Sequence, residues 1–376
     1  IFDDLAINPN QPSMGAYFTS PSAVNDAVMT MYGYMSTQRC LGASGSKTTI
    51  IRSDEASSNS DYGKPGMFGA DLNASYYTIE QPYTLMYTTA SQASYIIETA
   101  PSVDFSGNEE LRNAYMGEAY FWRAFAHYYL LINFRNISPI RQMPRNGDDY
   151  VRPLEKPAAV WNFIQEDLAH AKELLPVKGY WDSKNAGRVT KASAAALLGK
   201  AYLYRSGIEQ YYGEDKTTFY SEAAKEFGDV IDGKYGTYDL TKNYADNFDV
   251  AHENNEESIL EFQFLGDVDN AGFNPGLATS GLAFDSRGLM LPGAGVGYEG
   301  VVHNWLYNAF VNSVDKDGYT DIRMFSTMIF NDLDASIHLR NDAGGNPVRL
   351  EGPGGYKWEE LYPAKNGKEG FATVSN

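Results

Sequence analysis

The fold is decided by the stretch EELRNAYMGEAYFWRAFAHYYLLINF, which occupies residues 109–134. Its large apolar side chains recur at steps of three, four and seven residues, the spacing that places them on one face of a helix. Alanines lie between them, and small residues beside large ones let two helices approach closely. Pro139 and Pro144 then end the helical pattern. We therefore predict a buried helix over residues 109–134, with this apolar stripe: Leu111, Tyr115, Trp122, Phe125, Tyr129 and Ile132.

Three further stretches show helical spacing, and short loops containing Pro or Gly join them. This arrangement favours antiparallel helix pairs stacked as a solenoid, and the last two helices resemble one tetratricopeptide-type unit. The fold class is therefore predicted to be mainly α, a tetratricopeptide-like solenoid of helical pairs. The predicted helices run from Ala158 to Leu175 before Pro176, from the N-cap Thr190 to about Arg205 with Gly207 beyond, and from Thr218 to Ile231 before Gly233.

The sequence changes character after about residue 236, where Gly, Asn and Asp become frequent. We predict a helical region over residues 1–235 and a loop-rich insertion with short strands over 236–376. Within the insertion we expect a strand at 258–264, a helix at 301–314, an extended stretch at 325–330 and loop over 341–376. We also expect the chain to stop before its fold is complete.

Composition excludes several classes of protein. The formal net charge is −18, the wrong sign for neutralising nucleic-acid phosphates or an anionic membrane surface. The single cysteine, Cys40, cannot form an intrachain disulfide and is predicted to be a buried apolar residue. No apolar stretch approaches the roughly 20 residues that a membrane-spanning helix needs. The 28 tyrosines are the positive signal, because a ring with a polar tip suits a partly hydrated binding surface.

No catalytic, metal or cofactor motif stands out. Residues 42–48, 267–272 and 295–300 partly match a phosphate loop, a calcium loop and a dinucleotide-binding turn, but each lacks a required residue or its flanking structure. No pair of carboxylates is singled out as an acid and a base. We therefore expect no enzyme activity, no cofactor and no metal. The histidines show no metal-ligand spacing and are expected to be ordinary polar residues: His127, His170, His252, His303 and His338.

Five motifs in order along the chain carry a family resemblance. The most specific is GRVTKASAAALLGKAYLY at residues 187–204, and the stretches at 109–140 and 160–176 hold two further helices with a characteristic sequence. Ser53-Asp54-Glu55 comes before them, and Asp317-Gly318-Tyr319-Thr320-Asp321-Ile322-Arg323 comes after. Together these motifs resemble the SusD/RagB family of outer-membrane nutrient-binding lipoproteins, although Ile322 replaces the family's usual proline.

The resemblance implies both a fold and a role. Family members build an α-helical fold on tetratricopeptide-like pairs, with a loop-rich insertion that helps form the ligand surface. They bind oligosaccharides, or peptides in the RagB branch, without cleaving them, and act as the lid of a SusC-like TonB-dependent transporter. A lipid anchor on an N-terminal Cys holds them on the cell exterior. Cys40 is too far inside the chain for that role, so the anchor is expected upstream of Ile1, and the family's final helical pair is missing from this sequence.

The resemblance also indicates where a ligand would bind. Aromatic rings can cover the flat C–H faces of pyranose rings, while a few polar side chains bind the hydroxyls. Tyr62 and Tyr298 are flanked by Gly and are favoured for exposure, whereas ordinary packing is at least as good an interpretation for Phe68, Tyr76 and Trp305. A helical-toroid glycoside hydrolase is the alternative from another class, supported only by the acidic, aromatic-rich composition. The candidate ligand-binding residues are Arg52, Asp54, Tyr62, Phe68, Tyr76 and Tyr77, then Phe284, Arg287, Tyr298 and Trp305.

Overall fold

A computed structural model gives the fold of the chain. The residues it describes are 18–37, 40–42, 53–57, 74–145, 149, 151–213, 217–248, 250–263, 301–328 and 374–375. They divide into two compact units. The helical unit takes described residues from Ile1–Cys40, Pro82–Asp239 and Ser258–Asn270, and the mixed unit takes those from Leu41–Gln81, Leu240–Glu257 and Ala271–Asn376. The predicted boundary between 235 and 236 stays a prediction.

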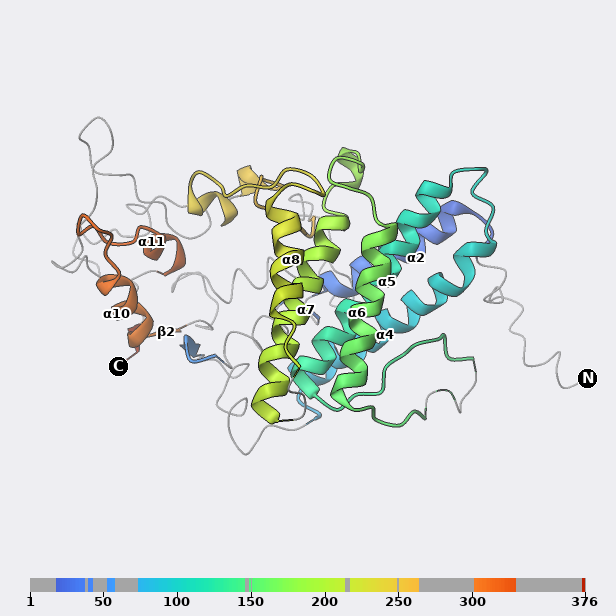
Figure 1. Cartoon of the computed structure of the whole chain (residues 1–376), viewed down its shortest axis with the longest axis horizontal. Helices are drawn as coiled ribbons and strands as arrows, with labels where there is room; N and C mark the ends of the chain where they lie inside the picture. Colours follow the sequence, from blue (N-terminus) through green and yellow to red (C-terminus); the bar gives the residue numbers. More distant parts are fainter. Residues whose placement is uncertain are drawn as a thin grey trace, which may run out of the picture. The chain divides into compact units, whose positions relative to one another are not determined.

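The helical unit confirms the mainly α fold class. Helices α5, α6, α7 and α8 lie side by side, each packed against the next along the chain, and α2 packs against α5 (Figure 1). The short 3-10 helices η3 (Ala100–Ser102) and η5 (Ser183–Asn185) lie in the connections. The α-helices are α2 (Pro21–Ser36), α4 (Tyr77–Thr99, in this unit from Pro82), α5 (Glu109–Phe134), α6 (Pro157–Leu174), α7 (Lys191–Tyr212) and α8 (Tyr220–Ile231).

Local signals explain where these helices begin and end. The Asn108 side chain accepts a hydrogen bond from the Leu111 backbone N–H and caps α5, which begins at Glu109 as predicted. Thr190 caps α7 in a capping box with Ser193, as predicted for its start. The predicted end of α7 near Arg205 is wrong, because Gly207 lies within the helix and α7 continues to Tyr212. Gly213 then ends it in the left-handed conformation, with a φ of 69°.

The core of the helical unit interleaves large and small residues. Trp122 and Trp161 are fully buried, and so is Cys40, as predicted. A Cβ added to Gly117 of α5 would lie 2.9 Å from the backbone nitrogen of Leu175, so this position requires a glycine. The predicted alternation of bulky and small residues along α5 therefore lets α6 pack closely against it.

The mixed unit is built from short elements. Strand β2 (Val301–His303) pairs antiparallel with β1 (Ala56–Ser57) and parallel with β3 (Val374–Ser375), with Val302 opposite both Ala56 and Val374. Helix α10 (Asn304–Asn312) follows β2 directly. The remaining elements are η6 (Tyr244–Phe248), η7 (Val250–His252) and α11 (Arg323–Thr327).

Three sequence predictions for the chain between residues 236 and 330 are wrong. Residues 301–303 form a strand instead of the first turn of a helix, because they pair with β1 and β3. Residues 325–327 are helical instead of extended, because Asp321 accepts the Arg323 backbone N–H at the start of α11 and the α11 residues Met324 and Phe325 are buried in a small core. Residues 258–263 form no strand, and the Ile259 carbonyl accepts a hydrogen bond from Ser193 instead.

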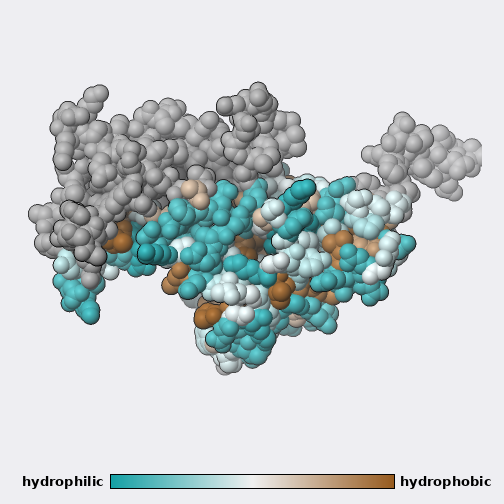
Figure 2. Space-filling model, turned by 90° about the horizontal axis from the view of Figure 1, so that it is seen from above, coloured by the Kyte–Doolittle hydropathy of each residue, from teal (hydrophilic) through white to brown (hydrophobic). Residues whose placement is uncertain are grey.

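On the face that Figure 2 shows, the described residues are largely hydrophilic, with apolar residues scattered among them. Among these residues, no helix combines the length and the apolar character that crossing a bilayer requires. This finding agrees with amphipathic helices that bury one face against their neighbours.

Candidate functional site

Two of the predicted ligand-binding residues, Asp54 and Trp305, come together in the mixed unit. The pairing of β1 with β2 brings their chain segments side by side, and the His303 backbone N–H donates to the Glu55 carbonyl at 2.9 Å. The Trp305 indole N–H then donates to the Asp54 carbonyl oxygen. Trp305 nevertheless remains 47% exposed. The ring is therefore fixed by a hydrogen bond while much of its surface stays available for contact.

The other predicted residues fall into two groups. Tyr76 is half-buried and precedes α4, and its carbonyl accepts hydrogen bonds from the backbone N–H groups of Ile79 and Glu80. Tyr77 is the first residue of α4. The rest lie outside the described residues: Arg52, Tyr62, Phe68, Phe284, Arg287, Tyr298, His338, residues 341–373 and 376 of the predicted loop, and most of the partial motifs at 42–48, 267–272 and 295–300. The loop prediction is wrong for 374–375, which form β3 because they pair with β2.

A pocket of about 430 Å³ lies between α4 and the segment after α5, and we call it the α4 pocket. Tyr83 and Tyr87 stand one turn apart on α4, with ring centroids 4.9 Å apart and edge-to-face geometry. The Tyr87 hydroxyl accepts a hydrogen bond from the Ser138 backbone N–H, and burial raises the pKa of that hydroxyl. The sequence analysis missed this pocket. The repeat of Tyr and hydroxyl residues along α4, at 83, 84, 87, 88 and 91, is the signal that could have found it.

Arg152 fixes the far wall of the α4 pocket. Its guanidinium donates to the backbone carbonyls of Asp149, Pro139 and Gln142, at 2.5, 3.4 and 3.3 Å. These three carbonyl partners hold the guanidinium in place at the wall of the pocket. With aromatic rings on one side and a fixed guanidinium on the other, the pocket can accept a ligand that presents both C–H faces and hydroxyl groups.

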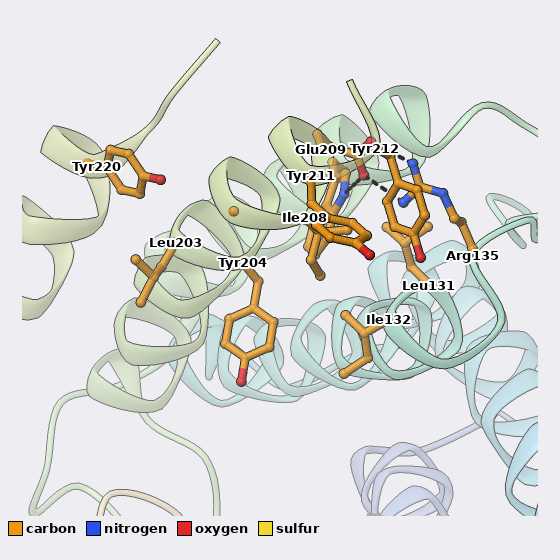
Figure 3. A pocket seen from close by; sticks show the side chains of 12 residues that line it. Leu131, Ile132, Arg135, Leu203, Tyr204, Ile208, Glu209, Tyr211, Tyr212 and Tyr220 are labelled. Carbon is orange, nitrogen blue, oxygen red and sulfur yellow. Dashed lines mark hydrogen bonds and ion pairs between the residues drawn. The ribbon is translucent and has the colours of Figure 1, made fainter. Parts of the chain in front are cut away.

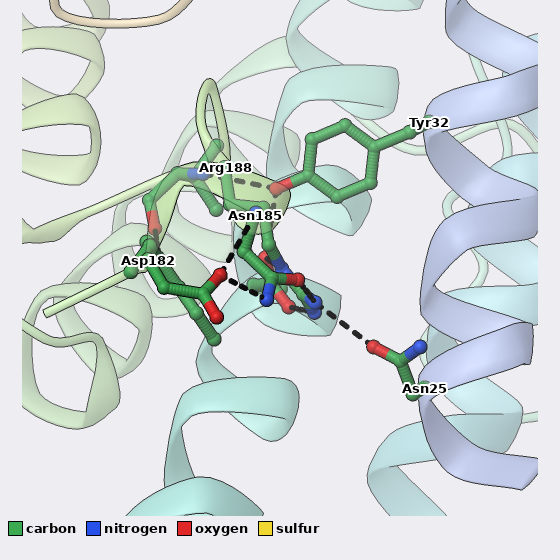
Figure 4. Close-up of polar contacts among 8 residues, drawn as sticks. Asn25, Tyr32, Asp182, Asn185 and Arg188 are labelled. Atoms are coloured by element: carbon green, nitrogen blue, oxygen red, sulfur yellow. Dashed lines mark hydrogen bonds and ion pairs between the residues drawn. The ribbon is translucent and has the colours of Figure 1, made fainter. Parts of the chain in front are cut away.

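A buried polar cluster around Arg188 ties together α2, α5 and the loop before α7 (Figure 4). The Arg188 guanidinium donates to both carboxylate oxygens of Glu118, at 2.9 and 2.5 Å, and to the side-chain oxygen of Asn25 at 2.8 Å. The Tyr32 hydroxyl donates to Glu118 at 2.8 Å and accepts from the Val189 backbone N–H at 2.9 Å. Every member of the cluster is therefore engaged in holding the helices together.

His127 is buried on α5 and has a partner on each ring nitrogen. Its Nδ1 lies 2.7 Å from the Arg123 carbonyl, and its Nε2 accepts the Ile140 backbone N–H at 2.9 Å. These partners assign the proton to Nδ1 and require a neutral ring. Burial lowers the pKa of His127 from 6.5 to about 3, which agrees with that assignment. The residue is structural, as expected for a satisfied polar histidine.

The buried acids of the helical unit are all paired. Asp167 binds Arg123 at 2.7 Å, and Glu226 binds Lys172 at 2.6 Å. Glu118 and Glu209 bind Arg188 and Arg135. Within the described part of the chain, no group of three or more His, Cys, Asp or Glu is arranged to hold a metal ion.

Comparison with known proteins shows which family this chain resembles. A SusD-like family model with the description "Starch-binding associating with outer membrane" matches residues 6–203. A SusD-like protein of Bacteroides ovatus is 29% identical over 180 residues, which are 48% of this chain and 32% of the relative.

Solved structures share the fold. A SusD superfamily protein from Bacteroides vulgatus matches with a TM-score of 0.65 at 22% identity, over 85% of this chain and 63% of that one. A laminarin-binding SusD-like protein matches with a TM-score of 0.63 at 23% identity, over 77% of this chain and 64% of that one. This chain thus spans about a third of the B. ovatus relative and under two thirds of both structures. Because the family model matches more than half of the chain, the chain belongs to the SusD-like family.

Proposed function

We propose that this chain binds oligosaccharides without cleaving them. The observation that carries the proposal is the family match over residues 6–203, whose description is starch binding at the outer membrane. The laminarin-binding protein with the same fold supports it. Fold alone does not define a ligand, so the argument for a carbohydrate also needs side chains of suitable chemistry.

The binding residues proposed are the ten candidates from the sequence, which fall in two windows, one of residues 52–77 and one of residues 284–305. Asp54 and Trp305 belong to this set, and the hydrogen bond from the indole to the Asp54 carbonyl holds the ring in place while it stays about half exposed. A fixed, partly exposed ring can cover the C–H face of a pyranose at little cost in side-chain entropy. We propose that the other residues of the two windows add rings and polar partners to the same ligand surface.

A non-catalytic role is supported by the state of the buried acids. Glycoside hydrolysis needs two carboxyl groups, one able to donate a proton and one able to act as base or nucleophile. In the helical unit, Glu118, Asp167, Glu209 and Glu226 are each engaged by a cation. Carboxylates held in this way serve to join helices.

We further propose that the protein is held on the exterior of the outer membrane by a lipid anchor preceding Ile1, and that it forms the lid of a SusC-like TonB-dependent transporter. Family membership supports this role. Co-purification of the lipid-anchored protein with a co-expressed SusC-like transporter tests it. A stable complex is expected, and a protein that elutes free from solubilised membranes would count against it.

Calorimetry with a panel of neutral oligosaccharides tests the binding function. We expect at least one to bind, and we expect Tyr62→Ala, Tyr298→Ala and Trp305→Ala each to weaken binding about tenfold, because each removes one ring from the ligand surface. Phe248→Ala is the matched control, because Phe248 is an exposed aromatic of the mixed unit outside the predicted set. Binding of peptides and of no glycan would move the assignment to the RagB type, and release of reducing sugar would replace it with a hydrolase.

A further inference from the structure

A second pocket, of about 560 Å³, lies in the helical unit, and we call it the α7 pocket (Figure 3). It exists because α7 continues past Gly207 for more than a turn and carries Ile208, Glu209, Tyr211 and Tyr212 to its rim. The C-terminal end of α5, Trp161 of α6 and Tyr220 of α8 complete the wall. None of these residues belongs to the predicted ligand windows.

The charged groups of the α7 pocket neutralise each other. Among its lining residues only Arg135 and Glu209 carry charge. Two guanidinium nitrogens of Arg135 lie 3.4 and 3.0 Å from the Glu209 carboxylate oxygens, and the Trp161 indole N–H donates to the same carboxylate at 2.9 Å. Glu209 is buried, so leaving it unpaired would cost the helical unit stability. The pocket therefore presents no uncompensated charge to a ligand.

Aromatic and aliphatic side chains dominate the exposed part of the pocket. The Tyr212 ring lies over the Arg135 guanidinium, 3.7 Å from its carbon, and makes an edge-to-face pair with Tyr211 at 5.1 Å. Tyr211 is 84% exposed. Of the 17 large apolar side chains that are exposed among the described residues, six line this one pocket: Ile132, Leu203, Tyr204, Tyr211, Tyr212 and Tyr220.

We infer that the α7 pocket is a second carbohydrate site, which binds one or two neutral pyranose units. Tyrosine rings offer flat faces for sugar C–H groups, and their hydroxyls can both donate to and accept from sugar hydroxyls. The pocket volume lies within the roughly 300–1,000 Å³ of small-ligand sites, and it is concave, unlike most protein–protein interfaces. Because Arg135 and Glu209 are already paired, the pocket favours uncharged sugars over uronic acids or sulfated sugars. This inference rests on the proposed oligosaccharide-binding function and adds a second site to it.

Titration of the full chain with laminarihexaose and cellohexaose tests the inference. Calorimetry on the wild type should show two sites for at least one of these sugars. Tyr211→Ala should weaken one of them about tenfold, and Tyr211→Phe should keep it, because the ring is retained. Tyr211 is so exposed that its loss should leave the unfolding temperature unchanged. Tyr244→Ala, an exposed tyrosine of the mixed unit, is the control and should leave both sites intact.

The two proposals fail in different ways. If Tyr62→Ala, Tyr298→Ala and Trp305→Ala together abolish all sugar binding, the second site is refuted while the proposed function stands. If neither hexasaccharide nor any other glycan binds, the proposed function fails and the second site with it. Equal affinity of the Tyr211-dependent site for a hexagalacturonate would overturn the preference for neutral sugars. A further outcome is that the wild type forms dimers that Tyr211→Ala abolishes, while no sugar site depends on Tyr211. That result would show that the pocket is a protein contact and would refute the inference.

Discussion

The helical unit and the mixed unit are stabilised by different interactions. In the helical unit, long amphipathic helices bury two tryptophans completely and join their polar groups in bidentate ion pairs such as Arg123–Asp167 and Arg188–Glu118. In the mixed unit, strands of two or three residues rely on a few backbone hydrogen bonds, and no residue of α10 is buried. The two units therefore differ in what holds them together, buried side-chain ion pairs in the helical unit and short strand pairs in the mixed unit.

The ion pairs of the helical unit have a clear physical consequence. A buried pair contributes modestly when complete, but removing one partner leaves a charge with no solvent and no counter-ion. The Arg188 and Glu118 side chains are 4% and 0% exposed. The free energy of unfolding of the helical unit should therefore depend more on keeping both partners of each buried ion pair than on any single exposed contact.

The largest effect should follow from breaking this cluster with Arg188→Met. We expect a loss of roughly 3–5 kcal/mol in the free energy of unfolding, because Glu118 is left buried without its cation. Urea denaturation measures it. The control is Arg112→Met, since Arg112 pairs with exposed Glu109 at 3.8 Å and should cost less than about 1 kcal/mol.

A double variant distinguishes the buried charge from lost packing. Adding Glu118→Gln to Arg188→Met removes the uncompensated charge and should recover part of the lost stability. If Arg188→Met costs no more than Arg112→Met, the buried ion pairs do not stabilise the helical unit more than an exposed pair does.

The pH dependence of the free energy of unfolding tests the buried, neutral state of His127 in the helical unit. The pKa of His127 in the folded state is lowered to about 3. Between pH 6.5 and 3, His127 is therefore protonated in the unfolded chain and neutral in the folded chain. Stability should fall with decreasing pH in this window, by up to about 1.4 kcal/mol for each pH unit. Burial raises the pKa values of Glu118 and Asp167, and these groups act in the opposite direction as the pH falls.

The contribution of His127 is isolated by substitution. His127→Gln has no titrating ring, so its free energy of unfolding should fall less steeply between pH 6.5 and 4 than that of the wild type. His170→Gln is the control for the substitution itself, because His170 is exposed on α6. Parallel profiles for His127→Gln and the wild type would contradict a neutral buried ring with two partners.

Helix α5 could be predicted from its sequence to the residue, because its stripe and the Asn108 cap are both local signals. The length of α7 could not. Gly207 matches a helix stop, yet a glycine costs a helix only about 1 kcal/mol, and neighbouring residues are held by packing and by the buried Glu209. Helix α4 also escaped prediction, because Pro82 lies inside it and its exposed stripe is hydroxyl-rich.

The candidate site, too, could be predicted only where local sequence signals define it. Sequence motifs indicate which windows supply the rings, and the structure brings Asp54 and Trp305 together through β1 and β2. Strand pairing between residues almost 250 positions apart leaves no local pattern, so the sequence predicts a helix over 301–303 where the structure has a strand. The α4 and α7 pockets escaped for a related reason, since each combines side chains from elements distant in sequence.

The smallest effect is the most direct test of the comparison, because the same substitution can be made in both units. Trp181 in the helical unit and Trp305 in the mixed unit each donate an indole N–H to a backbone carbonyl, that of Val189 at 3.2 Å and that of Asp54. Changing either to Phe removes one hydrogen bond, worth about 0.5–1.5 kcal/mol. Trp181 also lies against the Arg188 guanidinium at 4.2 Å, whereas Trp305 is about half exposed. We therefore expect Trp181→Phe to cost more in urea denaturation than Trp305→Phe, while Trp305→Phe, with its ring less firmly held, should weaken glycan binding more than Trp181→Phe. The reverse order in urea denaturation would contradict the stronger hold on Trp181, and the reverse order in glycan binding would contradict the proposed role of Trp305.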